Sequence, residues 1–421
     1  MLYGPCPRSS INLWPEAGEP DGDAADKVSW RAVTEPDTVL VQRLRDAAQK
    51  IVEMAAEVSW RGPDPYDGLF ARWPAPLVAG PRRRQAIVQL HARSPVDIRR
   101  LYGRRHHSLV PKAPALLGQA ASRLVAARED NHLRELARDA LETLCADTTC
   151  GADGWGYPWD TQTRWSHYPG GSPNVVATAF SANALAEAAI ILGEPKWRLR
   201  AERAAGWVAS ELFLPGAGYF AYHGHSDRLV HNANLLGAAL VHELAPEAPG
   251  VAEAVSIATA RTLDAQRPDG TWPYGEAAGL EWVDGFHTGY VLDSLCRLEG
   301  VDQRIPAAIE RGSRVYLSDF FDADGRARLW RRRRYPEDSH SAGTGLTVLT
   351  RLAERDLVPA ETLGRVARYT LTHMVHRNGH AVFRRQRWGA TRVFYTRWCD
   401  APVALGLASA AAYFDTDTRS S

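Results

Sequence analysis

The sequence predicts an all-α fold, an (α/α)6 toroid in which six inner helices are ringed by six outer helices. Three observations predict it: an apolar segment recurs six times, an amphipathic segment lies between successive apolar ones, and glycine turns separate the pairs. A period of this kind indicates repeated helix pairs that cannot bury their own faces alone. With 45% hydrophobic and 24% charged residues in 421, the chain has the composition of a globular protein with a large core.

The apolar segments are predicted to be the inner helices. They are apolar almost all round, which is typical of a helix that is covered on every side. Their intervals are 53 to 60 residues. They begin near Ala115, Asn174, Asn232, His287, His340 and Asp400.

The amphipathic segments are predicted to be the outer helices, and Thr38 to Val58 supplies the first of them. In the clearest one, apolar residues recur at the i, i+3, i+4 and i+7 spacing of a helix with one buried face, from Leu363 to Met374. A closed ring explains both helix types, whereas an open superhelix would need inner helices with a polar concave face.

A glycine turn follows each later amphipathic segment, because glycine supplies the positive φ of a tight reversal. Trp, Tyr or Phe follows most of these turns within a few residues, which predicts short β-like aromatic hairpins in the crossings. The turns are at Gly154, Gly218, Gly270, Gly325 and Gly379.

The predicted organisation is a flexible N-terminal tail over 1–36, a single toroid domain over 37–415 and a C-terminal tail over 416–421. The start of the chain lacks the pattern of a signal peptide and no uninterrupted apolar run reaches a membrane span, so we expect a cytoplasmic protein. Lys and Arg (50) balance Asp and Glu (49), which argues against a nucleic-acid partner. The five scattered cysteines are expected to be thiols. The oligomeric state is not indicated.

If the inner helices all run the same way, their N-termini and the loops before them meet at one mouth, where helix dipoles and polar groups converge. Two of these positions repeat one pattern: Asp284 precedes His287, and Asp338 precedes His340. A carboxylate can orient an imidazole and raise its basicity, so these four residues are the predicted catalytic groups. The alternative is that both aspartates only cap helices and the histidines fill the packed end of the ring.

Substrate binding is predicted for polar and aromatic residues of the same mouth. Arg397 is expected to hold an anionic group of the substrate. Trp and Tyr rings suit the faces of sugars, and they equally suit a carbocation. The aromatic candidates are Trp155, Trp159, Trp272, Tyr274 and Tyr335, and the other polar candidates are Asn174, Asn232 and Asp400.

No cofactor or metal is predicted, since no local CxxC or HxxxH spacing is present. A zinc site is the lesser interpretation. It would draw on the aspartates and histidines of the mouth together with Cys399 and Asp400.

Two resemblances support this interpretation. Gln266 to Trp272 matches the Q-x3-G-x-W repeat of the squalene cyclase and protein prenyltransferase β-subunit toroids, and Asp284 to Tyr290 resembles the prenyltransferase stretch that carries a zinc-binding histidine. By that likeness His287 would be a ligand. Segments at Asp64–Gly68, Arg93–Asp97, Asn232–Gly237, Trp282–His287, Tyr335–Ser341 and Arg397–Trp398 resemble a bacterial toroid family associated with capsule and exopolysaccharide biosynthesis genes. This second likeness implies glycan metabolism.

We therefore expect an enzyme of polysaccharide or glycoconjugate metabolism that carries out acid-base chemistry on an anionic sugar or glycan, of lyase, epimerase or hydrolase type. One alternative is an isoprenoid cyclase or prenyltransferase-like toroid, in which the same aromatics guide a cation. Another is a glycan-binding scaffold without catalysis. Paired acid-base groups within hydrogen-bond reach in a cleft would separate an enzyme from the scaffold.

Overall fold

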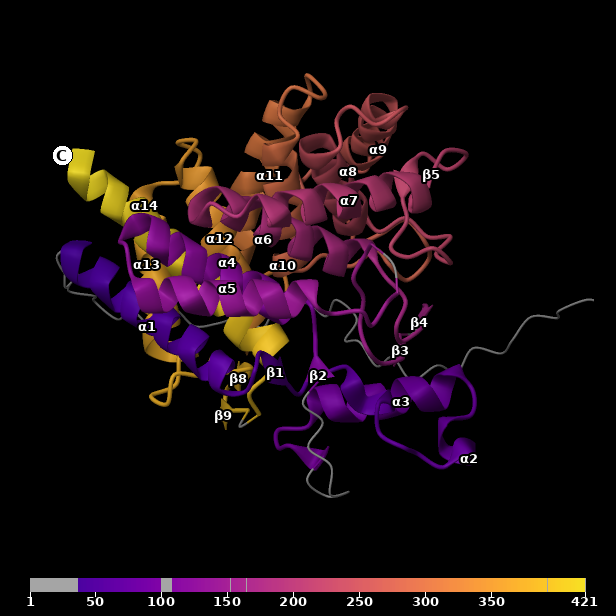
Figure 1. Ribbon diagram of the computed structural model, residues 1–421, viewed down its shortest axis with the longest axis horizontal. Coiled ribbons are helices and arrows are strands. Elements are labelled where there is room, and N and C mark those ends of the chain that lie inside the picture. Colours follow the sequence, from indigo (N-terminus) through magenta and orange to yellow (C-terminus); the bar gives the residue numbers. More distant parts are fainter. Residues whose placement is uncertain (1–36, 100–107, 152, 164, 392, 421) are drawn as a thin grey trace, which may run out of the picture. The chain divides into compact units, whose positions relative to one another are not determined.

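The computed structural model describes residues 37–420 except 100–107, 152, 164 and 392, and the side chains of 37 and 416–420 are also outside the description. These residues belong to one compact unit that runs from Glu35 to Ser421. Figure 1 traces the chain from the indigo α1 to the yellow α14. The predicted tail over 1–36 lies outside the described residues, and the one predicted from 416 continues helix α14 as far as Ser420.

Six inner helices form a closed ring, because each packs against the next and the last packs against the first. They are α4 (Lys112–Ala127), α6 (Val175–Leu192), α8 (His231–Leu244), α10 (Gly285–Arg297), α12 (Ser339–Ala353) and α14 (Ala401–Ser420). The contact between α14 and α4 closes the ring. All six predicted apolar segments are therefore confirmed as inner helices.

Six outer helices pack against the inner ones, and their buried residues recur on one face, as the amphipathic pattern predicts. They are α1 (Asp37–Glu57), α5 (Asn131–Cys145), α7 (Pro195–Glu211), α9 (Val251–Asp264), α11 (Ile305–Phe320) and α13 (Ala360–Tyr369). Helix α1 packs against α14 and α4, so the first and last segments of the ring lie side by side. The (α/α)6 prediction is confirmed.

The crossings contain short antiparallel strands, as predicted from the glycine turns. They pair β1 (Arg61–Gly62) with β2 (Ser108–Leu109), β3 (Thr161–Gln162) with β4 (His167–Tyr168), β5 (Phe213–Leu214) with β6 (Tyr219–Phe220), and β7 (Glu337–Asp338) with β8 (Arg384–Gln386) and β9 (Gly389–Ala390). Four of the five predicted turn glycines have positive φ, from 73° at Gly218 to 97° at Gly379. The short helices α2 (Ala75–Val78) and α3 (Pro81–Arg93) are an insertion between α1 and α4.

The inner helices begin at the same end of the ring. The residue that caps one inner helix pairs with the loop that precedes the next: Asn174 with His223, Val230 with Gly275, Asp284 with Trp330, and Asp338 with Arg384. Such a chain of pairings requires neighbouring N-termini. The mouth predicted from the sequence is therefore present.

The other end of the ring is held by ion pairs between inner helices. Arg123 of α4 contacts Glu187 of α6 at 2.5 Å, and Arg351 of α12 contacts Asp293 of α10 at 2.5 Å. Helix α6 is long and apolar enough to cross a membrane, with mean hydropathy 1.8, but 67% of its residues are buried. Asn183 and Glu187 interrupt its apolar run. Its burial identifies α6 as a core helix of the ring.

Candidate active site

Side-chain caps position the chemistry at the mouth. Asn174, Asp284 and Asp338 each precede an inner helix and accept a hydrogen bond from a backbone N–H of its first turn, at 2.9 to 3.0 Å. These are the residue types that N-caps favour, since their short side chains satisfy N–H groups that have no helical partner. The caps fix both predicted histidines at the start of their helices.

Asp284 and His287 form a hydrogen-bonded dyad. The carboxylate Oδ2 of Asp284 lies 2.6 Å from Nδ1 of His287, while its Oδ1 caps the helix, and Trp282 donates from Nε1 to the same carboxylate at 3.2 Å. Asp284 is 3% exposed, whereas the side chain of His287 is 22% exposed. A carboxylate acceptor at Nδ1 places a proton there, so Nε2 is the nitrogen that can exchange a proton with a substrate. This arrangement suits a general base or acid.

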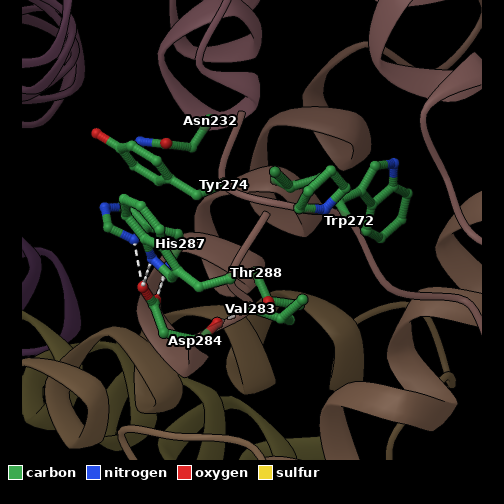
Figure 2. Close-up of a pocket in the computed structure, with 10 residues that line it drawn as sticks. Asn232, Trp272, Tyr274, Val283, Asp284, His287 and Thr288 are labelled. Atoms are coloured by element: carbon green, nitrogen blue, oxygen red, sulfur yellow. Dashed lines mark hydrogen bonds and ion pairs between the residues drawn. The ribbon is translucent and has the colours of Figure 1, made fainter. Parts of the chain in front are cut away.

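The dyad borders a pocket with aromatic and polar walls, shown in Figure 2. Tyr274 stacks on Trp282 with centroids 4.4 Å apart and lies 4.5 Å from the His287 ring. Figure 2 shows Tyr274 between His287 and Asn232. The Oδ1 atom of Asn232 is buried and has no hydrogen-bond partner among the described residues, so it is available to a ligand. The space holds about one water molecule.

A second set of groups surrounds His340. Its Nδ1 lies 2.9 Å from the carbonyl oxygen of Trp398, and its Nε2 lies 2.8 Å from the hydroxyl of Tyr290. That hydroxyl also lies 2.9 Å from Nζ of Lys112. His340 is 1% exposed, and burial lowers its pKa well below the usual value. The imidazole is therefore neutral and has both nitrogens occupied by protein groups.

The prediction that Asp338 orients the imidazole of His340 is wrong. Oδ1 of Asp338 caps α12 and its Oδ2 accepts from Nε of Arg384 at 2.8 Å. The reason is the spacing: His287 lies three residues after its cap, about 300° around the helix, whereas His340 lies two residues after, about 200° around. Only the first spacing returns the ring to the capping carboxylate.

The guanidinium group of Arg397 is bound to a carboxylate of the protein. Its Nε and Nη2 lie 2.5 and 2.6 Å from the two carboxylate oxygens of Asp64, and both residues are buried. Its guanidinium also lies 4.9 Å from the centre of the Trp398 ring and 5.4 Å from that of Tyr157. The predicted contact between this guanidinium and an anionic substrate is therefore not supported.

Several other predicted binding residues have structural partners. Trp155 is 1% exposed, donates to the carbonyl of Leu144 and lies under the Arg200 guanidinium, so its predicted sugar contact is wrong. Asn174 is a cap, as described above. Asp400 pairs with His380 at 3.0 Å and accepts from the backbone N–H of Ala381.

The three remaining aromatic candidates lie in different surroundings. Trp272 lines the pocket, although its Nε1 donates to the carbonyl of Thr262 and Figure 2 shows its ring turned away from His287. Trp159 is buried beside Phe70, with an Nε1 that has no partner within the described part of the chain. Tyr335 is half-buried below the Arg334 guanidinium and is not among the residues that line the pocket.

The described residues include no group of three or more His, Cys, Asp or Glu side chains arranged to hold a metal ion. Cys399 is buried, and burial raises the pKa of its thiol well above the ordinary value. Four cysteines are free thiols, as predicted, and Cys6 lies outside the described residues. The expectation of no cofactor stays a prediction.

Lys112 could not be recognised as a site residue from the sequence, because no motif surrounds it and it stands just before the apolar segment at Ala115. No local pattern assigned Tyr290 a role of its own or identified Asp64 and Arg384 as partners of Arg397 and Asp338. One signal was available for Lys112: it is one of only four lysines among 50 basic residues. The other 46 basic residues are arginines.

Solved structures of similar fold come from carbohydrate-active enzymes. An unsaturated glucuronyl hydrolase specific for heparin is 12% identical with a TM-score of 0.59 and covers 88% of this chain and 97% of its own. A possible GH105 family member from Salmonella enterica is 11% identical (0.58; 90% and 95%), and cellobiose 2-epimerase from Bacillus thermoamylovorans is 11% identical (0.55; 72% and 89%). No family model and no curated protein matches the sequence. These likenesses agree on the toroid fold.

Proposed function

We propose that this protein is a carbohydrate-active enzyme that transfers protons on a sugar, of epimerase, isomerase or lyase type. The observation that carries the proposal is the Asp284–His287 dyad, with 2.6 Å between the carboxylate and Nδ1, at a pocket walled by Tyr274 and Trp282. A partly exposed imidazole held by a buried carboxylate suits acid-base catalysis. Neighbours of the same fold act on sugars.

Hydrolysis of a glycosidic bond is less well supported. Glycosidases ordinarily use two carboxyl groups on opposite sides of the bond. Here the carboxylates near the mouth already have partners: Asp284 pairs with His287, Asp338 with Arg384, Asp64 with Arg397, and Asp400 with His380. Because these carboxylates are already paired, the site is better suited to removing a proton from a carbon atom than to cleaving a glycosidic bond with a carboxylic acid.

The same pairs bear on the charge of the substrate. Arg397 and Arg384 are each matched by an aspartate, so little uncompensated positive charge is left for a carboxylate or phosphate. We therefore favour a neutral reducing sugar over the anionic sugar expected from the sequence. The capsule and exopolysaccharide likeness seen in the sequence is consistent with either.

The two alternative functions receive less support. An isoprenoid cyclase would favour a wholly apolar cavity, whereas Asn232, Asp284, His287 and Thr288 line this pocket beside its aromatic and apolar residues. A non-catalytic scaffold would lack paired acid-base groups, and the dyad is such a pair.

The test is proton exchange in D2O. The protein is incubated with a panel of neutral aldoses, reducing disaccharides and uronates, and ¹H NMR follows loss of the proton next to the anomeric carbon and the appearance of an epimer, ketose or unsaturated product. His287→Gln should abolish the exchange. The matched control is His242→Gln, a half-buried histidine in the last turn of α8, which should keep it. Exchange that survives in His287→Gln, or none with any sugar in the wild-type protein, would contradict the proposal.

A further inference from the structure

Lys112 is a buried amine without a counter-ion. It is the first residue of α4 and 2% exposed, and its Nζ lies 3.8 Å from the ring centre of Phe180 and 2.9 Å from the hydroxyl of Tyr290. Among the described residues no carboxylate forms an ion pair with it, since Asp64, the nearest acidic influence, is bound by Arg397. An unpaired buried charge is costly. Burial, with the positive charge of Arg397, lowers the pKa of Lys112 well below its ordinary value, which favours the uncharged amine.

The hydrogen bonds from Lys112 run in one direction. The carbonyl of Trp398 can only accept, so Nδ1 of His340 carries the ring proton and Nε2 must accept. Tyr290 therefore donates its hydroxyl proton to Nε2, and its oxygen accepts from Nζ of Lys112 and from the hydroxyl of Thr344 at 3.3 Å. Burial raises the pKa of Tyr290 above its usual range, which keeps the phenol protonated. The network uses one N–H of Lys112 and leaves the lone pair of Nζ without a role in it.

This network adjoins the Asp284–His287 dyad. Tyr290 follows His287 by three residues, so both lie on the same face of α10. Phe286 lies between the two histidines, with ring centres 4.0 Å from His287 and 4.9 Å from His340. His287, Lys112 and Arg397 each lie close enough to His340 to lower its pKa when they are charged. The dyad and the amine are therefore neighbours in the fold, separated by Phe286 and Tyr290.

We propose that Lys112 is a second proton-transfer group of this site, with its amine facing the substrate and Tyr290 and His340 holding that amine in place. The inference rests on the proposed function and adds its second catalytic group. In the step, a C–H bond next to the sugar carbonyl breaks, Nζ gains the proton, and the electron pair stays with the substrate as an enediolate. His287 enters the step as the imidazolium and gives its Nε2 proton to the oxygen that gains negative charge, while its Nδ1–H keeps its hydrogen bond to Asp284. The products are an ammonium, a neutral imidazole and an enediol.

A structural role alone does not explain the lysine. Methionine would fill the same space beside Phe180 without a polar atom to desolvate, so a buried lysine here sacrifices stability. The chain otherwise uses four lysines against 46 arginines. An arginine would remain charged, because its guanidinium does not deprotonate in proteins, and could not accept a proton.

The first experiment is a titration of the ligand-free protein. With only four lysines, a sample labelled with ¹³C at lysine Cε gives few signals, and Lys112→Met identifies the one from residue 112. We expect this signal to titrate well below the ordinary lysine value of about 10.4. Titration together with the other lysines would overturn the inference, because the amine would be charged at neutral pH.

The second experiment measures turnover of the sugar found in the D2O panel. Lys112→Met and Lys112→Arg should lower kcat by about 10²- to 10⁴-fold with little change in KM. Lys112→Ala should be partly rescued by added methylamine or ethylamine, which a purely structural role would not allow. Lys196→Met is the matched control, because this exposed lysine pairs with Glu142 on the outer layer. Lys112→Met should fold at least as stably as the wild-type protein.

The outcomes separate the two proposals. If Lys112→Met keeps turnover while His287→Gln loses it, the inference on Lys112 is overturned and the proposed function stands. If the wild-type protein exchanges no sugar proton, the proposed function fails and the inference on Lys112 fails with it. Loss of kcat in both variants, with amine rescue at residue 112, would support both.

Discussion

Arg397 and Asp64 form a buried bidentate ion pair between segments 333 residues apart, with N–O distances of 2.5 and 2.6 Å. Asp64 belongs to the segment that follows α1, and Arg397 to the π-helical turn Thr396–Asp400 that leads into α14. The pair therefore joins the two ends of the ring beside the mouth. The carboxylate of Asp64 also accepts a hydrogen bond from the backbone N–H of Tyr66, so it fixes the loop around it as well.

Asp64→Asn should destabilise the fold by about 3–5 kcal/mol, because it leaves the Arg397 charge buried without its partner. Urea unfolding followed by circular dichroism measures the loss. Glu310→Gln is the control, since it removes an exposed ion pair with Arg314 on α11 and should change stability little. A similar small effect from both variants would show that the buried pair does not hold the ring together.

The two capping aspartates should separate catalysis from stability. Asp284→Asn keeps a capping oxygen but removes the charge that holds the His287 tautomer, so kcat/KM for the sugar should fall by about 10²- to 10⁴-fold. Asp338→Asn breaks the ion pair with Arg384 and should mainly lower the free energy of unfolding. Steady-state kinetics and urea unfolding of both variants are the measurements. Equal losses of turnover in the two variants would contradict the assignment of the dyad.

Buried His231 should make the fold sensitive to acid. Burial, with the charges of Arg261 and Arg267, lowers its pKa to about 4, against about 6.5 in an unfolded chain. Below pH 6.5 the unfolded chain binds a proton that the folded one does not, so this part of the stability is present above pH 6.5 and is lost as pH falls toward 4. Between pH 7 and pH 5 the wild-type protein should lose about 2 kcal/mol more than His231→Gln. Parallel unfolding curves for the two proteins would contradict the assignment.

The ring could be predicted from the sequence because its signals are local and repeated. Six apolar segments, the amphipathic ones between them and the glycine turns each follow from helix periodicity and turn chemistry. The caps at Asp284 and Asp338 could be predicted for the same reason, whereas Asn174, which was expected to bind substrate, caps α6. The Asp284–His287 dyad could also be predicted, because its two members are three residues apart, within one helical turn.

The partners of long-range pairs could not be predicted in this way. Lys112 meets Tyr290 across 178 residues and Arg397 meets Asp64 across 333, so no local spacing reveals either contact. Asp338 and His340 misled for a local reason: a spacing of two resembles a spacing of three in sequence but turns the imidazole away from the cap. Trp155 misled because its residue type suggested a sugar contact, whereas its ring is buried beside Leu144 of α5 and Arg200 of α7.

Close approach of α12 and α14 at Gly343 gives a last test of the ring. A Cβ atom at Gly343 would lie 2.4 Å from the backbone of Pro402, so Gly343→Ala forces the two inner helices apart. We expect a destabilisation of about 1–3 kcal/mol or more, since overpacking of a tight interface against backbone cannot relax through a side chain.

Gly206→Ala is the matched control, because Gly206 lies inside the outer helix α7 and a Cβ there meets nothing within 4 Å. Alanine favours a helix over glycine, so this variant should gain about 0.5–1 kcal/mol. The opposite signs separate the intrinsic helix preference of alanine from the steric demand of ring closure. A stabilising Gly343→Ala would mean that α12 and α14 do not pack this closely, and that the ring closes differently.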